Sequence, residues 1–255
     1  MKIQIIGAGV VGQATGRGFA RLGHEIVFVD TNKKTLEDLA PEFTVGNVPF
    51  PPVDVFFICV SEKVVEEVVT PIQEQFPRVL IVIRSTVPPG TAKKLSKGGH
   101  YHVCSNPEFL REAVAEYEFL NPPGIIIGEC CKEHGDLLER LYTPFRKPIY
   151  RTVLEVAELT KLSVNGYLAC QVSYWNQVKL LADKLGINSH EVGMLASYGD
   201  DRVSIYGSRM HGKAYGGKCL PKDLQQLIDL VQKTGVNGQL FEVIKAINDV
   251  MKGGE

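Results

Sequence analysis

The sequence predicts an α/β protein in which a doubly wound parallel sheet is followed by an all-helical domain with a long central helix. Up to about Thr152, short runs of apolar, mostly β-branched residues alternate with amphipathic helical stretches. A glycine-rich turn joins the first run to the first helical stretch, and beyond Thr152 only helical patterns follow. Such alternation is typical of strands buried between two layers of helices and joined by right-handed crossovers.

Seven strands are expected in the first domain, and the first four are apolar nearly throughout. In chain order the runs are KIQIIGAG, EIVFVD, VDVFFICV, RVLIVIRST, HYHVCSN, PGIIIGE and PIYR. The stretches between them predict helices at Val11–Leu22, Asn32–Leu39, Lys63–Phe76 and Cys131–Phe145. We place the domain boundary near Thr152, so that residues 1–152 form the sheet domain and residues 153–255 the helical domain.

The second domain opens with Leu154–Leu185, which has helical character throughout and contains Gly166 as its one break signal. Further helices are expected at Ser189–Ser197, Pro221–Thr234 and Gln239–Met251. The long helix carries more apolar and aromatic side chains than one domain easily covers, namely Leu168, Val172, Tyr174, Trp175 and Val178. A homodimer formed through Leu154–Leu185 is therefore predicted.

Composition narrows the class of protein. Apolar residues make up 44% and charged residues 22%, the balance of an ordinary soluble globular protein. The net charge of −1 argues against nucleic-acid or membrane-surface partners, because no basic excess is present to neutralise phosphates. The sequence shows no signal-peptide pattern and no apolar run of membrane-spanning length. Its six cysteines lack CxxC spacing, so we expect reduced thiols in a cytoplasmic protein.

The turn GAGVVG follows the first strand and opens the first helix, the arrangement of a Rossmann-type dinucleotide site. Its glycines permit a tight turn, close approach of a pyrophosphate and close helix–strand packing, and the helix N-terminus favours the phosphate charge. The residues expected at the cofactor are Gly7, Gly9, Val10, Val11 and Gly12. Asp30 ends the second strand, where its carboxylate favours NAD over the 2′-phosphate of NADP. Lys33 either assists on the adenosine side or is an ordinary exposed lysine, and a glycine turn without ligand is the alternative for the motif.

Two further motifs begin where strands end. RSTVPPGT places Ser85 and Thr86 at the carboxyl end of a central strand, where ligands bind in open α/β sheets. Taken alone, this stretch favours an ordinary Pro-Pro-Gly turn without a ligand. In SNPEFLREA, Pro107 suits a first helical turn, and Glu108 and Glu112 would then share one helix face. Such a pair serves as acid and base in some sites, but is more often a solvated helix face.

In ELTKLSVNGYL, Lys161 and Asn165 are spaced i and i+4 within an otherwise apolar helix. A positive charge and an amide donor on one inward face suit a developing oxyanion. A lysine whose aliphatic stem follows the surface is the alternative.

The segment YGGKCLPKD presents Cys219 near the start of a helix that contains Pro221. Lys218 and Lys222 flank the thiol, and this positive potential favours the thiolate that attacks a carbonyl carbon. Asp223 is placed to orient a water. The sequence therefore predicts an activated nucleophile at Cys219, whereas Cys59 and Cys104 lie within strand patterns and are expected to pack.

Taken in order, GAGVVG, STVPPGT, SNPEFLRE, ELTKLSVN and YGGKCLPKD resemble the UDP-glucose/GDP-mannose dehydrogenase family of nucleotide-sugar 6-dehydrogenases. The resemblance runs from Met1 to about Met251, and its last three motifs are highly specific. It implies that a primary alcohol of a nucleotide sugar is oxidised to a carboxylate by two NAD⁺, without release of the aldehyde. No metal is implied.

By this resemblance, Cys219 would attack the aldehyde made by the first hydride transfer, and a second transfer would give a thioester that water hydrolyses. Lys161 and Asn165 would stabilise the oxyanions, and Asp223 with Thr86 would position the water.

The remaining roles also come from the resemblance. Glu112 would lie near the water and the nicotinamide, and Glu108 would assist proton transfer during hydrolysis. The sugar would be held by Phe109, Leu110, Arg111, Gly216 and Gly217, together with Lys161 and Asn165. Further contacts to the cofactor would come from Val60, Ser61, Ser85, Thr86, Glu112 and Lys222.

This sequence departs from the family pattern in two places. Family members continue into a second α/β domain that grips the nucleotide, whereas this chain ends at or just after the helix Gln239–Met251. The stretch between Asp30 and Val53 is short, and CVSEK stands where the family usually shows a Pro-Thr-Pro turn near NAD. The sequence therefore does not determine which sugar and which nucleotide base the substrate contains.

Two other functions fit part of the pattern. A β-hydroxyacid dehydrogenase would use Lys161 with an asparagine four residues later, one NAD(P) and no catalytic thiol. A non-catalytic NAD-binding module would bind the cofactor without turning over a nucleotide sugar.

Overall fold

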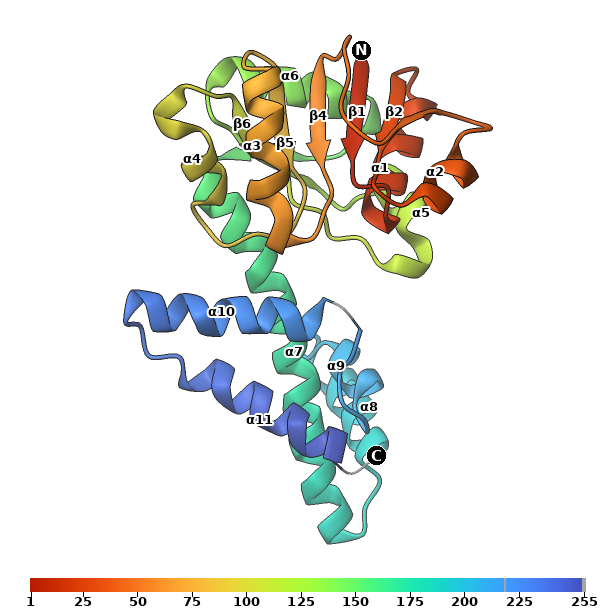
Figure 1. The fold of residues 1–255 in the computed structure, drawn as a ribbon. Coiled ribbons are helices and arrows are strands. Elements are labelled where there is room, and N and C mark those ends of the chain that lie inside the picture. Colours follow the sequence, from red (N-terminus) through yellow and green to blue (C-terminus); the bar gives the residue numbers. More distant parts are fainter. Residues whose placement is uncertain (218, 254–255) are drawn as a thin grey trace. The chain divides into compact units, whose positions relative to one another are not determined.

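The computed structural model describes residues 1–217 and 219–253 (Figure 1). The chain forms two compact units, Met1–Lys161 and Leu162–Glu255. The division falls inside helix α7, Leu154–Leu185, and therefore comes later than Thr152, where strand β8 ends. The reason is packing: Leu154 belongs to a core of the first unit, and Ala157 and Glu158 are buried as well.

The first unit is built on an eight-stranded sheet in the order β3-β2-β1-β4-β5-β6-β7-β8. The strands are β1 Lys2–Ile6, β2 Glu25–Val29, β3 Thr44–Gly46, β4 Val55–Ile58, β5 Leu80–Ile83, β6 Val103–Ser105, β7 Ile125–Gly128 and β8 Ile149–Thr152. All seven predicted strands form. The additional strand, β3, is only three residues long, too short to give a periodic signal.

The sheet is mainly rather than wholly parallel, which corrects the prediction. Strands β6 and β7 pair antiparallel, with Ser105 opposite Gly128, whereas β7 and β8 are parallel to each other. The connection from β6 to β7 therefore begins and ends at the same edge of the sheet. It contains the short helix α5, Ala115–Leu120, instead of a crossover that spans the sheet.

Helices cover both faces of this sheet (Figure 1). They are α1 Val10–Arg21, α2 Lys33–Leu39, α3 Val65–Gln75, α4 Thr91–Leu95, α5 and α6 Lys132–Tyr142. Alternate residues of each strand enter two separate cores, as a period of two requires. Ile5 and Phe57 pack in the core that includes α1, α5 and α6, whereas Ile6 and Phe56 pack in the core that includes α3 and α4. The expected two-layer covering of the sheet is confirmed.

The second unit consists of helices around a small core. Its members are the rest of α7, α8 Ser189–Gly199, α9 Ile205–Met210, α10 Leu220–Thr234 and α11 Gln239–Gly253. The core contains Ala169, Val172, Tyr215, Leu224, Ile228 and Ile244. The Asn248 amide ties the segment before Cys219 to α11, because its Oδ1 accepts from the Tyr215 N–H (2.7 Å) and its Nδ2 donates to the Tyr215 carbonyl (3.2 Å). The four helices predicted for the second unit all form, and α9 was not predicted.

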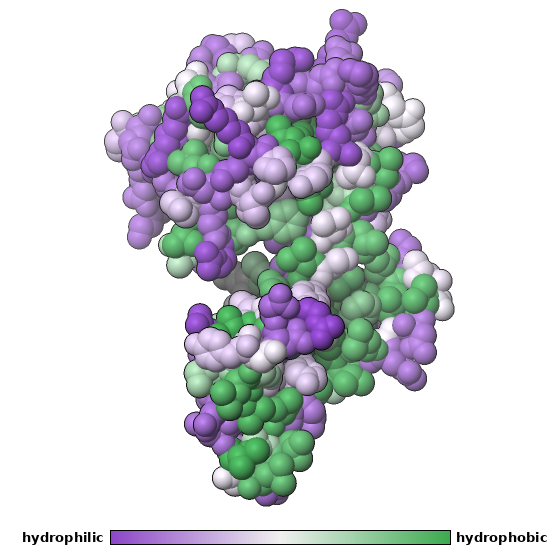
Figure 2. All heavy atoms as spheres, turned by 180° about the vertical axis from the view of Figure 1, so that it is seen from behind, coloured by the Kyte–Doolittle hydropathy of each residue, from purple (hydrophilic) through white to green (hydrophobic). Residues whose placement is uncertain are grey.

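Many large apolar side chains of the second unit lie at its surface. Those of α7 and α8 are Val164, Tyr167, Tyr174, Leu181, Leu185, Met194, Leu195 and Tyr198. Figure 2 shows hydrophobic residues over much of the visible face of this unit, whereas polar residues dominate the visible face of the sheet unit. Among the described helices, none combines the length and the apolar character that crossing a bilayer requires.

Candidate active site

The glycine-rich turn has the shape of a phosphate cradle. Gly7 adopts φ +95°, and a Cβ there would lie 2.6 Å from the Cys59 carbonyl oxygen, so only glycine fits. A Cβ on Gly12 would lie 1.9 Å from the Gly7 carbonyl oxygen. Gly9, by contrast, faces open space, and α1 begins at the next residue. The first N–H groups of α1 therefore border a space in which a pyrophosphate fits.

Asp30 is held in place by the backbone. Its Oδ2 accepts from the Ala8 N–H (2.7 Å) and its Oδ1 from the Asn32 N–H (2.8 Å). These bonds fix the carboxylate directly after β2, and each oxygen keeps a further lone pair for a ribose hydroxyl. Asp30 also lines a cavity of about 410 Å³ whose walls include Val29, Val60 and Pro71. An apolar cavity with one oriented carboxylate suits the adenosine half of a dinucleotide.

The loops after β4 and β5 meet at the same edge of the sheet as this turn, because β1, β4 and β5 are parallel neighbours. The Ser85 hydroxyl donates to the Val60 carbonyl (2.6 Å) and so ties the two loops together. Thr86 is half-buried beside it, and Ser61 is exposed with its hydroxyl 3.2 Å from Glu62. Lys33 is exposed at the start of α2. Ser85 thus has a structural bond of its own, which the motif did not predict.

The helix predicted at Pro107 is wrong. Residues 106–111 have no regular structure, and Glu112 only opens a 3₁₀ turn, Glu112–Val114. Local bonds compete with the helix: Glu108 accepts from the Leu110 N–H (2.6 Å), and the Arg111 Nε donates to Glu118 (2.6 Å). Glu108 and Glu112 consequently do not share a helix face.

The two glutamates lie in different surroundings. Glu108 is nearly buried, with its side chain 10% exposed, and its Oε1 lies 3.4 Å from the Nζ of Lys161. Glu112 is exposed and lines a shallow cavity together with Val10 and Gln13 of α1. Glu108 is therefore ion-paired with the lysine in a nearly buried site, and Glu112 lies beside the start of α1.

Lys161 is 6% exposed, the last residue of the first unit, and its Nζ lies 5.3 Å from the ring centroid of Phe109. A buried lysine needs such partners, and here a carboxylate and the face of an aromatic ring lie beside its Nζ. Leu110 is half-buried and Arg111 exposed in the same loop. The loop thus brings Phe109, one of the three predicted sugar contacts of this loop, to the lysine, whereas Arg111 is bound to Glu118.

Glu158 is a buried group that the sequence analysis missed. Its Oε2 accepts from the Gly90 N–H (2.6 Å) and its Oε1 from the Ala92 N–H (2.8 Å) at the start of α4. Burial raises the pKa of Glu158 to about 7, although these two bonds act in the opposite direction. Its signal in the sequence was a carboxylate one turn before Lys161 on an otherwise apolar helix. Glu158 fixes the turn that follows Thr86.

The second unit brings together a second set of polar groups. Cys219 is exposed at the start of α10, with Pro221 in the first turn, and its carbonyl accepts from the Asp223 N–H (2.9 Å). The Asn165 Nδ2 donates to the Oδ2 of Asp223, and both side chains are buried. The Nζ of Lys222 lies 2.8 Å from the Oδ1 of Asp223. Asn165 and Asp223 are thus a buried, hydrogen-bonded pair at the first turn of the helix that Cys219 precedes.

The glycines before Cys219 shape that turn. Gly217 adopts φ +74°, in the left-handed region that favours glycine, and Gly216 faces open space. Lys218, which the sequence analysis placed beside the thiol, lies outside the described residues. The predicted catalytic residues therefore form two groups, one in each unit: Thr86, Glu108, Glu112 and Lys161 in the first, and Asn165, Cys219 and Asp223 in the second.

Two family models match successive parts of the chain. The NAD binding domain of the UDP-glucose/GDP-mannose dehydrogenase family matches residues 52–146, and the central domain of the same family matches residues 155–250. The chain belongs to the UDP-glucose/GDP-mannose dehydrogenase family. The match of the NAD binding domain also confirms the predicted cofactor class. A third model, described as NADP oxidoreductase coenzyme F420-dependent, matches residues 2–88.

Curated members of the UDP-glucose/GDP-mannose dehydrogenase family extend over nearly all of the chain. The GDP-mannose 6-dehydrogenase of Pseudomonas aeruginosa is 32% identical over 89% of it, and a UDP-glucose 6-dehydrogenase of Bacillus subtilis is 26% identical over 98% of it. The chain spans 63% of the length of the first relative and 66% of the second.

Solved structures give the same result for the fold. A UDP-glucose dehydrogenase from Pyrobaculum islandicum matches 98% of the chain with a TM-score of 0.87 and 26% identity, and the match covers 68% of that protein. A 3-hydroxyisobutyrate dehydrogenase from Mycobacterium tuberculosis matches 98% of the chain with a TM-score of 0.79 and 17% identity, and the match covers 92% of that protein. At 17% identity the second likeness shows the fold alone.

Proposed function

We propose that this chain carries the cofactor and central domains of an NAD-dependent nucleotide-sugar 6-dehydrogenase, which oxidises the 6-hydroxyl of the sugar to a carboxylate in two hydride transfers. The observation that carries the proposal is the exposed thiol of Cys219 at the start of α10, beside the buried Asn165–Asp223 pair. All three residues lie within the match to the family's central domain. A dehydrogenase that performs a single oxidation has no use for such a thiol.

The cradle beside Gly9 and the oriented carboxylate of Asp30 fit NAD. When bound, the nicotinamide accepts a hydride from the substrate carbon. The residues of this chain then hold the sugar, stabilise charge and move protons. Lys161 supplies a positive charge toward the oxygen of the reacting carbon, and Glu108, whose Oε1 lies 3.4 Å from the lysine Nζ, takes up or returns the proton of the reacting group.

Covalent capture follows the first oxidation in the proposed mechanism. The Cys219 sulfur, as thiolate, bonds to the aldehyde carbon to give a thiohemiacetal, whose oxyanion Lys161 and Asn165 stabilise. Loss of a second hydride, to a second NAD⁺, converts it to a thioester. Water then attacks the thioester carbon, and the thiolate leaves as the carboxylic acid forms. The start of α10 favours the thiolate at both stages, since a helix N-terminus stabilises negative charge.

Asp223 and Thr86 are assigned to the hydrolytic water. Asp223 is 1% exposed and is held by Asn165 and Lys222, so its carboxylate has a fixed direction. Glu112 is assigned to the nicotinamide side because it lies beside Val10 at the start of α1. The sugar is assigned to the loop Phe109–Arg111 and to Gly216–Gly217, and Lys222 to an anionic group of cofactor or substrate.

The number of NADH formed per sugar tests the reaction type. Incubation of limiting UDP-glucose, GDP-mannose or a UDP-N-acetyl sugar with excess NAD⁺ should yield two NADH per sugar with the true substrate class. One NADH per molecule with a β-hydroxyacid substrate would instead support a β-hydroxyacid dehydrogenase, the alternative favoured by the Lys161–Asn165 spacing. Tight NAD binding with no turnover of any of these compounds would support a non-catalytic module.

We also propose that the protein is a cytoplasmic homodimer joined through α7. All six cysteines, each of which the structure describes, are free thiols, the state that a reducing compartment maintains. Tyr167, Tyr174 and Leu181 are spaced by seven along α7 and are all about 60% exposed, so one helix face presents three large, mainly apolar side chains at heptad spacing. Sedimentation should show a dimer at micromolar concentration and a monomer for Tyr174→Glu, whereas a monomeric wild-type protein would contradict the proposal.

A further inference from the structure

A cluster of histidine and cysteine side chains lies in the first unit, away from the dinucleotide cradle. His102 directly precedes β6, Cys130 follows β7, and His134 is in the first turn of α6. Because β7 is antiparallel to β6, its carboxyl end lies beside the amino end of β6. These residues therefore meet at the edge of the sheet opposite to the carboxyl ends of β1, β4 and β5, where the cradle is found.

The separations between these side chains are those of metal ligands. One ligand atom each from His102, Cys130 and His134 lies within 4.8 Å of the other two. The Cys130 Sγ is 3.5 Å from the His134 Nδ1. Around a tetrahedral Zn²⁺, with Zn–S of about 2.3 Å and Zn–N of about 2.0 Å, a sulfur and a nitrogen ligand are about 3.5 Å apart. The pair is therefore already at the spacing that a shared ion requires.

Two more thiols border the cluster. The exposed Cys131 has its Sγ 3.0 Å from the same His134 Nδ1, and the buried Cys104 has its Sγ 3.6 Å from the Cys130 Sγ. The Cys104 Sγ also accepts a hydrogen bond from the Cys130 N–H (3.4 Å), so this buried thiol borders the cluster and is not assigned as a ligand. Cys131 is outside the group of three whose ligand atoms all lie within 4.8 Å of one another, but its thiol already contacts the imidazole nitrogen that Cys130 faces. Imidazole and thiolate together are the donors preferred by Zn²⁺, whereas Mg²⁺ and Ca²⁺ take oxygen ligands.

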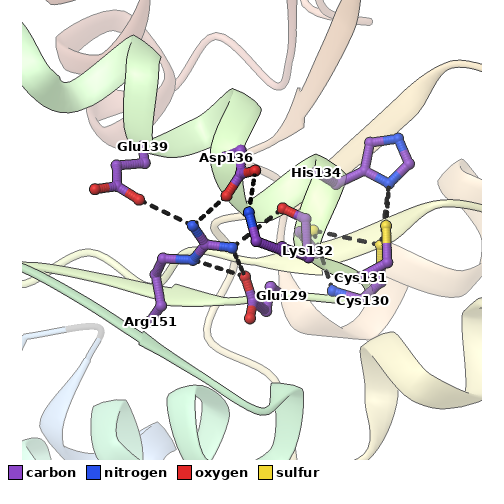
Figure 3. A network of polar contacts seen from close by, with 9 residues as sticks. Glu129, Cys130, Cys131, Lys132, His134, Asp136, Glu139 and Arg151 are labelled. Atoms are coloured by element: carbon purple, nitrogen blue, oxygen red, sulfur yellow. Dashed lines mark hydrogen bonds and ion pairs between the residues drawn. The ribbon is translucent and has the colours of Figure 1, made fainter.

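An arginine network holds the two segments of the cluster in position. Arg151 of β8 donates to Glu129 (2.8 Å), which directly precedes Cys130, and to Asp136 (2.5 Å) and Glu139 (2.9 Å) of α6. Figure 3 shows this guanidinium between the three carboxylates, with His134 and the two adjacent cysteines on the neighbouring stretch of chain. The end of β7 and the first turns of α6 are thus fixed before any ion binds, which lowers the cost of forming the site.

We propose that His102, Cys130 and His134 bind one Zn²⁺ ion, with Cys131 as the fourth ligand, and that the ion joins the amino end of β6 to the start of α6. Binding releases the thiol protons of Cys130 and Cys131, because zinc binds thiolates. Four protein ligands close the coordination shell, so the role is structural and separate from the dehydrogenase chemistry.

The test uses the full chain, purified with a non-thiol reductant and freed of metal. Titration with Zn²⁺ against a chromophoric chelator should give one tight site per chain, and Co²⁺ should show the absorption of a tetrahedral thiolate complex. Cys130→Ser and His134→Gln should each weaken Zn²⁺ at least tenfold, because loss of even an outer-shell partner costs about 10- to 100-fold. Zn²⁺ should also raise the melting temperature of the wild-type protein but not of these two variants.

Three matched controls separate this site from adventitious binding. His100→Gln removes an exposed histidine two residues from His102, Cys170→Ser removes a half-buried thiol of α7, and Cys219→Ser removes the exposed thiol assigned to the dehydrogenase. All three should bind Zn²⁺ like the wild type. Equal affinity in Cys130→Ser and wild type, or loss of binding in Cys219→Ser, would overturn the proposal. A Cys104–Cys130 disulfide that forms in air despite stoichiometric Zn²⁺ would also overturn it, because the two sulfurs would then be redox partners.

Discussion

The two units differ in how much of their structure each can stabilise alone. The sheet unit has two extensive cores, one on each face, which contain residues such as Phe19, Phe28 and Phe57 with no exposed surface. The core of the helical unit is built around six buried residues, and large side chains such as Tyr174 and Leu181 remain exposed. A small core contributes little burial, so the helical unit is expected to be the less stable of the two and to need a partner surface.

The difference also separates the predicted chemistry. The sheet unit has the cofactor cradle and the Glu108–Lys161 pair, whereas the helical unit has the thiol and the Asn165–Asp223 pair. A substitution in the sheet unit should therefore affect cofactor binding first, whereas a substitution in the helical unit should affect the chemistry of the thiol first. The four predictions below use this separation, and they run from the largest expected effect to the smallest.

Replacement of the nucleophile should have the largest effect. Cys219→Ser should lower the rate of carboxylate formation at least about 10³-fold, because a serine hydroxyl at a helix start does not replace a thiolate. NAD affinity, a property of the sheet unit, should not change. The measurement is steady-state NADH formation with product analysis, and Cys170→Ser is the matched control. Unchanged carboxylate formation would rule out covalent catalysis and leave a single-oxidation mechanism.

Truncation of the helical core should separate the two units. Leu224→Ala removes a side chain that is 1% exposed in the core of the second unit, and should lower its free energy of unfolding by about 2–5 kcal/mol. NAD binding, followed by calorimetry, should survive because the cradle lies in the other unit. Unfolding monitored by circular dichroism checks the loss of stability. A loss of NAD affinity in Leu224→Ala that matches its loss of stability would show that the two units fold as one.

The buried carboxyl group of Glu158 predicts a pH dependence within the sheet unit. Its pKa is raised from 4.5 to about 7 in the folded protein, so its contribution to stability is full below pH 4.5 and falls as pH rises through 7. The largest loss is about 3 kcal/mol. Urea unfolding at pH 5 and pH 8 should show this loss in the wild type and a smaller one in Glu158→Gln. The control is Glu74→Gln, an exposed residue of α3, and an identical pH dependence of wild type and Glu158→Gln would contradict the prediction.

A pair of glycine substitutions tests the cradle with the smallest expected effect. Gly9→Ala places a methyl group in space that is open within the protein, so it should weaken NAD binding about 10- to 100-fold by obstructing the pyrophosphate while stability stays unchanged. Gly12→Ala places its methyl group 1.9 Å from the Gly7 carbonyl oxygen, and should instead destabilise the sheet unit by about 1–3 kcal/mol. Melting curves and NAD titrations distinguish the two. Normal NAD affinity in Gly9→Ala would mean that the cradle does not bind the phosphates.

The sequence by itself determined the elements that depend on local pattern. Apolar runs located the seven longer strands, and α7 and α10 begin within one residue of their predicted starts because each helix pattern is long and well bounded. The glycine turn, Asp30 and Cys219 were also found at the positions their motifs imply, since each depends on the chain immediately around it.

Tertiary structure decided the rest. The antiparallel pairing of β7 arises because the chain re-enters the sheet at the same edge where β6 ends, and β3 is a strand only because it pairs with β2. Neither feature has a signal in the local sequence. The loop at Pro107 is not helical because the Glu108 carboxylate accepts from the Leu110 N–H and pairs with Lys161 instead of facing solvent. Glu158 and the His102–Cys130–His134 cluster join residues far apart in the chain. Local sequence fixes backbone preference through nearby atoms, whereas these sites arise from contacts that form only when distant segments are packed together.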